Sequence, residues 1–161
     1  MALPDYFTLF EIPQSFHPDP LEVRRKYYAL SLQHHPDRAT GDRSTEALRM
    51  SALVNDAYKT LTDPDRTMGY LLRLNGVVEE EEQYKLSPDF LMEMMELNES
   101  IDEGGNQAAE SWQAAATYWN TNTAPLIKSF EQGERTEPLF VALKDYYYQK
   151  KYLMRIKERM F

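Results

Sequence analysis

The sequence predicts an all-α protein in two parts: an N-terminal four-helix unit built on an antiparallel helical hairpin, and a C-terminal three-helix bundle. Three observations favour this fold. Apolar residues recur at intervals of three and four, as on one face of a helix. Short polar residues stand directly before prolines at three points, a common helix start, and no run sustains the alternation typical of a strand. With 161 residues, 42% of them apolar, the chain can bury a core in each part.

Residues 6–10 and 20–33 are the first two expected helices. Asp5 can cap the first, and Asp19 followed by Pro20 gives the second an N-cap and a proline at its first position. The spacing of the second helix predicts an apolar stripe, which faces the core, made of Leu21, Tyr28 and Leu32, with Tyr27 and Leu30 beside it. Its basic residues Arg24, Arg25 and Lys26 are expected to cluster on the more polar surface.

Residues 44–61 and 64–74 complete the first unit. Thr62-Asp63-Pro64 marks the start of the shorter helix, and Asn75-Gly76 marks its end. The longer helix should run antiparallel to residues 20–33, because only a short polar loop separates them. Its expected core stripe consists of Ala47, Leu48, Val54, Ala57, Tyr58 and Leu61.

The second unit is expected to hold helices at residues 88–103, 106–132 and 136–161. Ser87 and Pro88 start the first of them, and Gly104-Gly105 stops it. Pro125 lies inside the second, so we expect a kink or break near residues 120–123. The core candidates in this helix are Trp112, Trp119, Leu126 and Phe130.

The net charge of -8 is concentrated in the middle of the chain. Residues 77–103 carry ten acidic residues and one lysine, whereas residues 1–76 nearly balance. We therefore expect one domain at 1–76, an acidic solvated linker at 77–86, and a second domain at 87–161. An acidic middle argues against nucleic acid, which attracts basic faces, and favours a basic protein partner.

The chain contains no cysteine, which excludes disulfides and thiolate metal sites. No run approaches the ~18 apolar residues that a membrane-spanning helix needs. The first residues lack the pattern of a signal peptide. We expect a cytoplasmic protein that works without a cofactor or a membrane.

The tripeptide His35-Pro36-Asp37 is the first candidate for chemistry. Pro36 should end the preceding helix and leave His35 and Asp37 at the mouth of the hairpin. A metal site is disfavoured because the adjacent His34 and His35 cannot easily face one ion. A serine triad is disfavoured because the sequence has no nucleophile elbow, and it has no phosphate-binding glycine loop either. An enzymatic role is therefore not expected.

The helix at residues 88–103 carries more apolar residues than one core stripe needs. The stripe itself is Phe90, Met94, Leu97 and Ile101. An adjoining face holds Leu91, Met92 and Met95, rimmed by Glu96, Glu99 and Glu103. Two interpretations are open at this point: a helix buried on two sides, or an exposed patch that binds a basic partner.

Three tyrosines stand in a row at residues 146–148, in the last expected helix. A helix cannot bury three consecutive residues on one stripe. At least one of these tyrosines should therefore be partly exposed, and tyrosine is frequent in binding hot spots.

The tripeptide, set between a basic helix and a helix that ends at residues 55–61, resembles a J-domain. Residues 5–10 and 90–97 narrow this resemblance to the HscB family, the J-type co-chaperones of iron–sulfur cluster assembly. The resemblance covers nearly the whole chain and is strongest in residues 5–76 and 87–103. It implies that the J-domain stimulates ATP hydrolysis by a DnaK-type chaperone (HscA-like), and that the bundle holds an IscU-type iron–sulfur scaffold.

The resemblance also implies roles for single residues. The residues expected to bind the chaperone are His35, Pro36, Asp37, Arg38, Arg24, Arg25 and Lys26. Those expected to bind the scaffold are Leu91, Met92, Met95, Glu96, Glu99, Glu103 and Tyr147. Arg38 stands where the family often has lysine, and Met95 stands where it usually has leucine.

Alternatives of two kinds stay open: a J-domain protein with another role, and an enzyme. The chain could be a J-domain adaptor for a different client, or a regulator that self-associates through residues 91–95. It could also be a metal-dependent enzyme built on its histidines.

Overall fold

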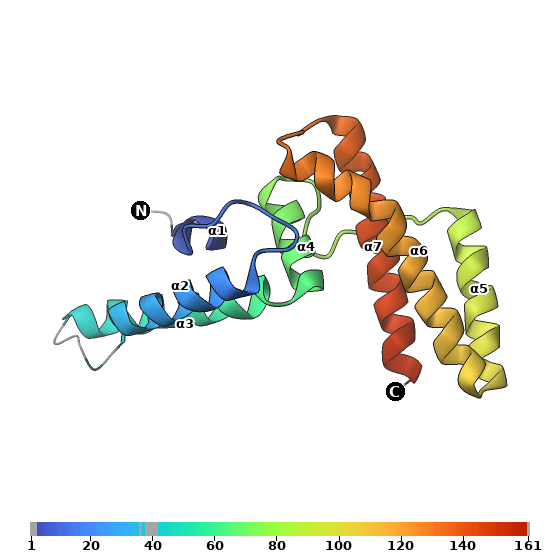
Figure 1. Cartoon of the computed structure of the whole chain (residues 1–161), viewed down its shortest axis with the longest axis horizontal. Coiled ribbons are helices and arrows are strands. Elements are labelled where there is room, and N and C mark those ends of the chain that lie inside the picture. Colours follow the sequence, from blue (N-terminus) through green and yellow to red (C-terminus); the bar gives the residue numbers. More distant parts are fainter. Residues whose placement is uncertain (1–2, 36, 38–41, 161) are drawn as a thin grey trace. The chain divides into compact units, whose positions relative to one another are not determined.

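The computed structural model describes residues 3–35, 37 and 42–160, without the side chains of residues 42 and 43. The described part contains seven α-helices and no strand (Figure 1). The chain divides into two compact units, Met1–Asn75 and Gly76–Phe161. Four helices lie in the first and three in the second, so the predicted all-α class is confirmed.

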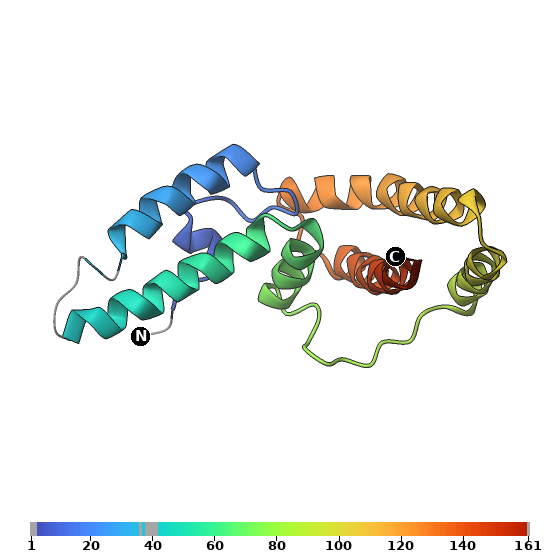
Figure 2. The ribbon, with the colours of Figure 1, turned by 90° about the horizontal axis from the view of Figure 1, so that it is seen from below.

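The first unit holds α1 (Tyr6–Leu9), α2 (Pro20–Gln33), α3 (Asp42–Leu61) and α4 (Pro64–Leu74). α2 and α3 lie side by side as an antiparallel hairpin (Figures 1 and 2), and α3 also packs against α1 and α4. Tyr27 joins the two long helices: its ring stacks on Tyr58 at 4.1 Å, and its hydroxyl donates to Asn55 at 2.8 Å. The two helices of the hairpin are therefore joined by a hydrogen bond as well as by stacked rings.

The helices begin where the capping residues predict. The side chain of Asp19 accepts a hydrogen bond from the backbone of Leu21 at 3.0 Å, and the following Pro20 needs no backbone partner. Asp63 and Ser87 act in the same way before the other two helices that open with proline. At α1, Asp5 accepts from the backbone of Thr8 at 3.0 Å.

The core of the first unit is rich in phenylalanine. Its buried members include Phe7, Phe10, Phe16, Val23, Val54, Ala57, Leu61, Met68, Leu71 and Leu72. Tyr6 fastens α1 to α4, because its ring stacks on Tyr70 at 4.2 Å and its backbone N–H donates to the Tyr70 hydroxyl at 2.9 Å.

The predicted core stripe of α2 is wrong about which side of the helix faces the core. Leu21 is 77% exposed, and Tyr28 and Leu32 are each 58% exposed, whereas Val23 is fully buried. Leu48 of α3, also expected in the core, is mostly exposed. Spacing shows which residues share a helix face, but the packing of the neighbouring helices decides which face is covered.

The second unit holds α5 (Pro88–Glu103), α6 (Asn106–Glu131) and α7 (Glu137–Met160). α6 packs against both α5 and α7 (Figure 1). The turn between α5 and α6 uses Gly104 and Gly105, whose φ angles of 77° and 81° favour glycine. Of the predicted kink or break near residues 120–123, the break does not occur: α6 continues through Pro125.

Two tryptophans seven residues apart join α6 to α7 in the same way. The indole N–H of Trp112 donates to the backbone carbonyl of Leu153, and that of Trp119 to the carbonyl of Tyr146, both at 2.7 Å. The ammonium of Lys157 lies 4.9 Å from the Trp112 ring centre, and that of Lys150 lies 4.5 Å from the Trp119 ring centre. Each tryptophan is therefore held by a carbonyl at its edge and a cation on its face.

Part of the expected linker is fastened to α7. Glu82 pairs with Lys144 at 2.6 Å instead of facing solvent freely. The ring of Tyr84 stacks on Tyr148 at 4.5 Å, and its hydroxyl donates to Asp145 at 2.8 Å. Burial and this hydrogen bond raise the pKa of Tyr84 to about 12.

Candidate functional site

The tripeptide that follows α2 presents a carboxylate to solvent. The Asp37 side chain is 89% exposed, with its carboxylate 3.6 Å from the imidazole of His35. The backbone N–H of Asp37 donates to Nδ1 of His35 at 3.3 Å, which orients the ring against the turn. Pro36 and Arg38 lie outside the described residues. An exposed carboxylate in this position can form a charge-assisted hydrogen bond with a basic group of another protein.

The predicted basic cluster of α2 is divided between two sides of the helix. Arg24 and Arg25 are exposed. The side chain of Lys26 is only 22% exposed and lies 3.8 Å from Glu11. Arg24 and Arg25 therefore face solvent together, while Lys26 fastens α2 to the segment that follows α1.

Both exposed arginines are held by neighbours on their own helix. Arg24 donates to the Tyr28 hydroxyl at 3.4 Å, and this hydrogen bond raises the pKa of Arg24. Arg25 donates to the carboxylate of Glu22, which raises the pKa of Arg25 and lowers the pKa of Glu22. Both guanidinium groups thus stay charged and have a defined direction.

α5 divides cleanly into a buried face and an exposed face. Phe90, Met94 and Leu97 are buried, as expected of the core stripe, whereas its fourth member, Ile101, is only half-buried. On the other side, Met92 and Met95 are each 62% exposed. Leu91 and the carboxylates of Glu96, Glu99 and Glu103 are exposed as well. We call these six exposed residues the α5 patch. The sequence left open whether α5 is buried on two sides or carries an exposed patch, and the exposure of these residues agrees with the second interpretation.

Tyr147, the aromatic residue expected to join the α5 patch, is half-buried on α7. Its ring meets Tyr148 edge-on at 5.1 Å, and the ammonium of Lys151 lies 5.6 Å from its centre. Tyr148 is buried, and Tyr146 is half-buried with its carbonyl bound to Trp119. The tyrosine row is therefore only partly exposed, as its spacing predicts.

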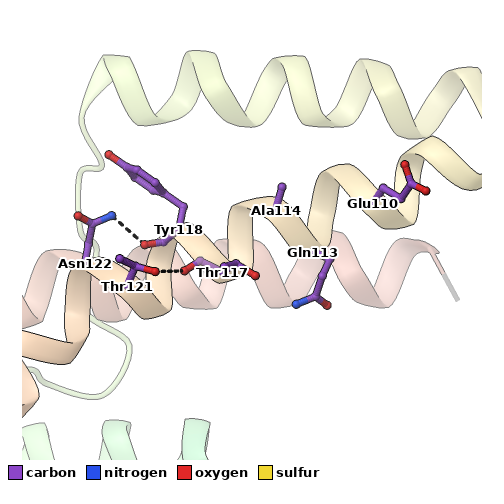
Figure 3. Close-up of a pocket in the computed structure, with 7 residues that line it drawn as sticks. All are labelled: Glu110, Gln113, Ala114, Thr117, Tyr118, Thr121 and Asn122. Atoms are coloured by element: carbon purple, nitrogen blue, oxygen red, sulfur yellow. Dashed lines mark hydrogen bonds between the residues drawn. The ribbon is translucent and has the colours of Figure 1, made fainter.

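One hollow in the second unit is lined by other residues. It has a volume of about 660 Å³ and lies along the outer side of α6, where Glu110, Gln113, Ala114, Thr117, Tyr118, Thr121 and Asn122 line it (Figure 3). Thr121 and Asn122 direct their side chains to backbone carbonyls one turn earlier, at 3.0 and 2.7 Å. None of the residues expected to bind a partner lines this hollow.

Within the described residues, no group of three or more histidine, aspartate or glutamate side chains is placed to hold a metal ion. Among the same residues, the helices are either too short or too polar for a membrane span.

Interpretation of the sequence missed one feature of α2. Leu21, Tyr28 and Leu32, assigned to the core, share the exposed face with Arg24 and Arg25. The spacing contained this information, because residues 21, 24, 25, 28 and 32 fall on one side of a helix.

Two family models match the chain in succession. A DnaJ domain matches residues 5–70, and the HSCB C-terminal oligomerisation domain matches residues 86–160. The first match contains α1 to α4, apart from the last turn of α4, and the second contains α5 to α7.

Named relatives share this arrangement. The iron-sulfur cluster co-chaperone protein HscB of Homo sapiens is 38% identical over 65% of this chain, which spans only 46% of the human protein. That of Mus musculus is 34% identical over 97% of this chain and 67% of its own length. The co-chaperone protein HscB homolog of Vibrio cholerae is 32% identical over 97% of this chain and 94% of its own length.

Solved structures agree with the sequence matches. The crystal structure of the human protein has a TM-score of 0.77 and 28% identity, over 99% of this chain and 82% of the human chain. The Vibrio cholerae structure has a TM-score of 0.69 and 28% identity, over 98% of this chain and 95% of the other. With both domains present in order and a relative aligned along almost its full length, the chain belongs to the HscB family of J-domain co-chaperones.

Proposed function

We propose that this chain is a non-enzymatic co-chaperone that stimulates ATP hydrolysis by a DnaK-type chaperone (HscA-like) and delivers an IscU-type iron–sulfur scaffold to it. The J-domain would contact the chaperone through the tripeptide of residues 35–37, Arg38 and the basic residues of α2. The bundle would bind the scaffold through the α5 patch and Tyr147. The names of the human and mouse relatives, which call them iron-sulfur cluster co-chaperones, support this assignment.

The observation that carries the proposal is the exposure of the α5 patch. One face of α5 already packs in the bundle, so the patch adds nothing to the core of its own unit. Three flexible apolar side chains beside three carboxylates suit a partner surface that is apolar with a basic rim. Lys26 is the weakest of the expected chaperone contacts, because Glu11 already engages it.

Isothermal titration of this chain with a purified IscU-type scaffold tests the delivery half of the proposal. We expect a one-to-one complex whose affinity falls when the α5 patch is altered. A scaffold that shows no binding to the intact chain would remove the assignment of the client, while leaving the J-domain activity to be measured separately.

Self-association is a second candidate role for the bundle. The family model that matches residues 86–160 is described as an oligomerisation domain, which favours it. Light scattering decides this point: a stable dimer that dissociates when Met92 and Met95 become alanine would assign the α5 patch to a second copy. A monomer that binds the scaffold would support delivery.

A further inference from the structure

Two neighbouring helices of the second unit carry charges of opposite sign. α5 contains six acidic residues and no basic one, whereas residues 150–160, the last part of α7, contain five basic residues and one acidic one. The two helices run in the same direction along each other, because Phe90 meets Tyr152 ring to ring, and further on Asn98 accepts a hydrogen bond from Arg159. An acidic helix therefore lies next to a basic one.

Three of the basic side chains of α7 lie in one row. Lys151, Arg155 and Arg159 are spaced four residues apart, so they follow one ridge of the helix over about 12 Å, and all three are exposed. We call these three residues the α7 ridge. The other two basic residues of this part, Lys150 and Lys157, lie over tryptophan rings of α6 instead. The ridge therefore carries the positive charge that this part of α7 turns towards solvent.

The ridge has more positive charge than its own unit uses. Arg159 donates to the side chain of Asn98 at 2.7 Å and lies 3.6 Å from the carboxylate of Asp102, so it joins α7 to α5. Among the described residues, neither Lys151 nor Arg155 has a carboxylate partner. Two charges of the ridge are therefore available to another protein.

The ridge borders the α5 patch. A second hollow, of about 280 Å³, lies between the two helices and is lined by Asn98, Tyr152, Arg155, Ile156 and Arg159. Asn98 follows Leu91 and Met95 at intervals of four and three residues, so these three lie on one side of α5. The glutamates of the patch lie about 100° further round the helix. The exposed surface therefore has the basic ridge at one edge, Leu91 and Met95 in the middle, and the glutamates at the other edge.

We propose that the α7 ridge, through Lys151 and Arg155, binds an acidic segment of the IscU-type scaffold and so fixes the direction in which the scaffold lies across the α5 patch. This inference rests on the proposed function, which assigns the adjoining patch to the scaffold, and it adds the sign of charge that the scaffold must carry at each edge. A scaffold turned end for end would bring like charges together at both edges, which disfavours that direction.

The test replaces Lys151 and Arg155 together by glutamine and measures binding of the purified IscU-type scaffold by isothermal titration at low and at high salt. At low salt we expect the affinity to fall about fivefold, because two exposed ion pairs are lost. At about 1 M salt, where the screening length is ~3 Å, the wild type and the variant should bind nearly alike. Lys151→Arg with Arg155→Lys, which keeps both charges, should bind like the wild type at low salt.

The matched control is Lys59→Gln with Lys128→Gln, which removes the same charge from exposed positions of α3 and α6 and should leave the titration unchanged. All variants should keep the thermal midpoint of the wild type, because the replaced side chains are exposed.

A glutamine variant of the ridge that binds like the wild type at low salt, while Met92→Ala with Met95→Ala loses affinity, would overturn the inference and keep the proposed function. Equal losses in this variant and in its control would also overturn the inference, because net charge alone would then explain them. A wild-type dimer that the glutamine variant abolishes would assign the ridge to a second copy instead. A wild-type chain that binds no scaffold would remove the proposed client and the inference with it.

Discussion

The carboxylate of Asp37 lies beside His35 just beyond the end of α2, with most of its side chain in water. Nothing in its environment buries the charge, so its removal costs the fold little. Because the carboxylate is exposed, it can accept a charge-assisted hydrogen bond from a basic group of another protein.

Replacement of Asp37 by asparagine keeps the shape and removes the charge. We expect stimulation of chaperone ATP hydrolysis to fall about tenfold or more, because hydrogen bonds to charged groups contribute about 1.5–3 kcal/mol. Single-turnover hydrolysis measures this, and calorimetric binding of the scaffold serves as the control. Loss of scaffold binding in the same variant would show that the substitution unfolds the protein instead.

Ionisation of Tyr84, which packs on α7, should make the stability of the fold depend on pH. Its pKa is raised to about 12 in the fold, whereas an unfolded chain has a tyrosine pKa of about 10. The fold prefers the neutral phenol, so this contribution to stability is complete below pH ~10 and is lost as the pH rises towards ~12. Denaturant midpoints of the wild type should therefore fall more steeply across this range than those of Tyr84→Phe. Parallel curves for the two proteins would show that Tyr84 does not contribute in this way.

At the scale of elements, the contact of α6 with α7 repeats. Trp112 and Trp119 each combine an indole hydrogen bond to α7 with a lysine over the ring, at a spacing of seven residues on both helices. Seven residues are close to two helical turns, so the repeated geometry is what two closely packed antiparallel helices allow.

Trp112→Phe keeps an aromatic ring and removes the indole N–H. We expect the free energy of unfolding to fall by about 1–3 kcal/mol, from a lost buried hydrogen bond and a small cavity. Urea unfolding measures the change, with Tyr118→Phe as the control, because that residue is 68% exposed on the outer side of α6. Equal stability of the two variants would mean that the indole contact adds little.

The α5 patch should show the opposite behaviour, with an effect on binding and none on folding. Met92→Ala with Met95→Ala should weaken scaffold binding about tenfold or more, since full burial of one methionine is worth about 1.5–3 kcal/mol. The thermal midpoint should hardly change, because both side chains are mostly in water. Val141→Ala, an exposed apolar change on α7, is the control for calorimetry. Unchanged scaffold affinity in the double variant would remove the patch from the binding site.

Helix starts and the faces of α5 could be predicted from the sequence because their causes are local. Asp19, Asp63 and Ser87 cap the helices that follow them, and the surplus of apolar residues on α5 shows that one face is left over. The face of α2 that turns towards the core could not be predicted in this way. Leu21, Tyr28 and Leu32 have the spacing of a core stripe, and only the packing of α2 on α3 turns Val23 inward instead.

Contacts between distant residues account for the other differences. Lys26 has an acidic partner fifteen positions earlier, and Glu82 and Tyr84 have partners about sixty positions later. A run of charges in a sequence does not reveal such pairs. The sequence therefore predicts exposed charges throughout the basic cluster and the acidic linker, whereas Lys26 and Glu82 are paired in the structure.

At the scale of the whole molecule, two compact units each present a surface that their own cores do not need. The first offers Asp37 and the arginines of α2, and the second offers the α5 patch. We propose that one chain must carry both surfaces in order to bring a scaffold to a chaperone.

Recovery of the IscU-type scaffold on an immobilised DnaK-type chaperone in the presence of ATP shows whether both surfaces must belong to the same molecule. The wild-type chain should retain the scaffold, whereas Asp37→Asn and the Met92→Ala, Met95→Ala double variant should each fail. An equal mixture of the two variants should fail as well, because no single molecule then carries both intact surfaces. Recovery of the scaffold by the mixture, to the wild-type level, would contradict the claim.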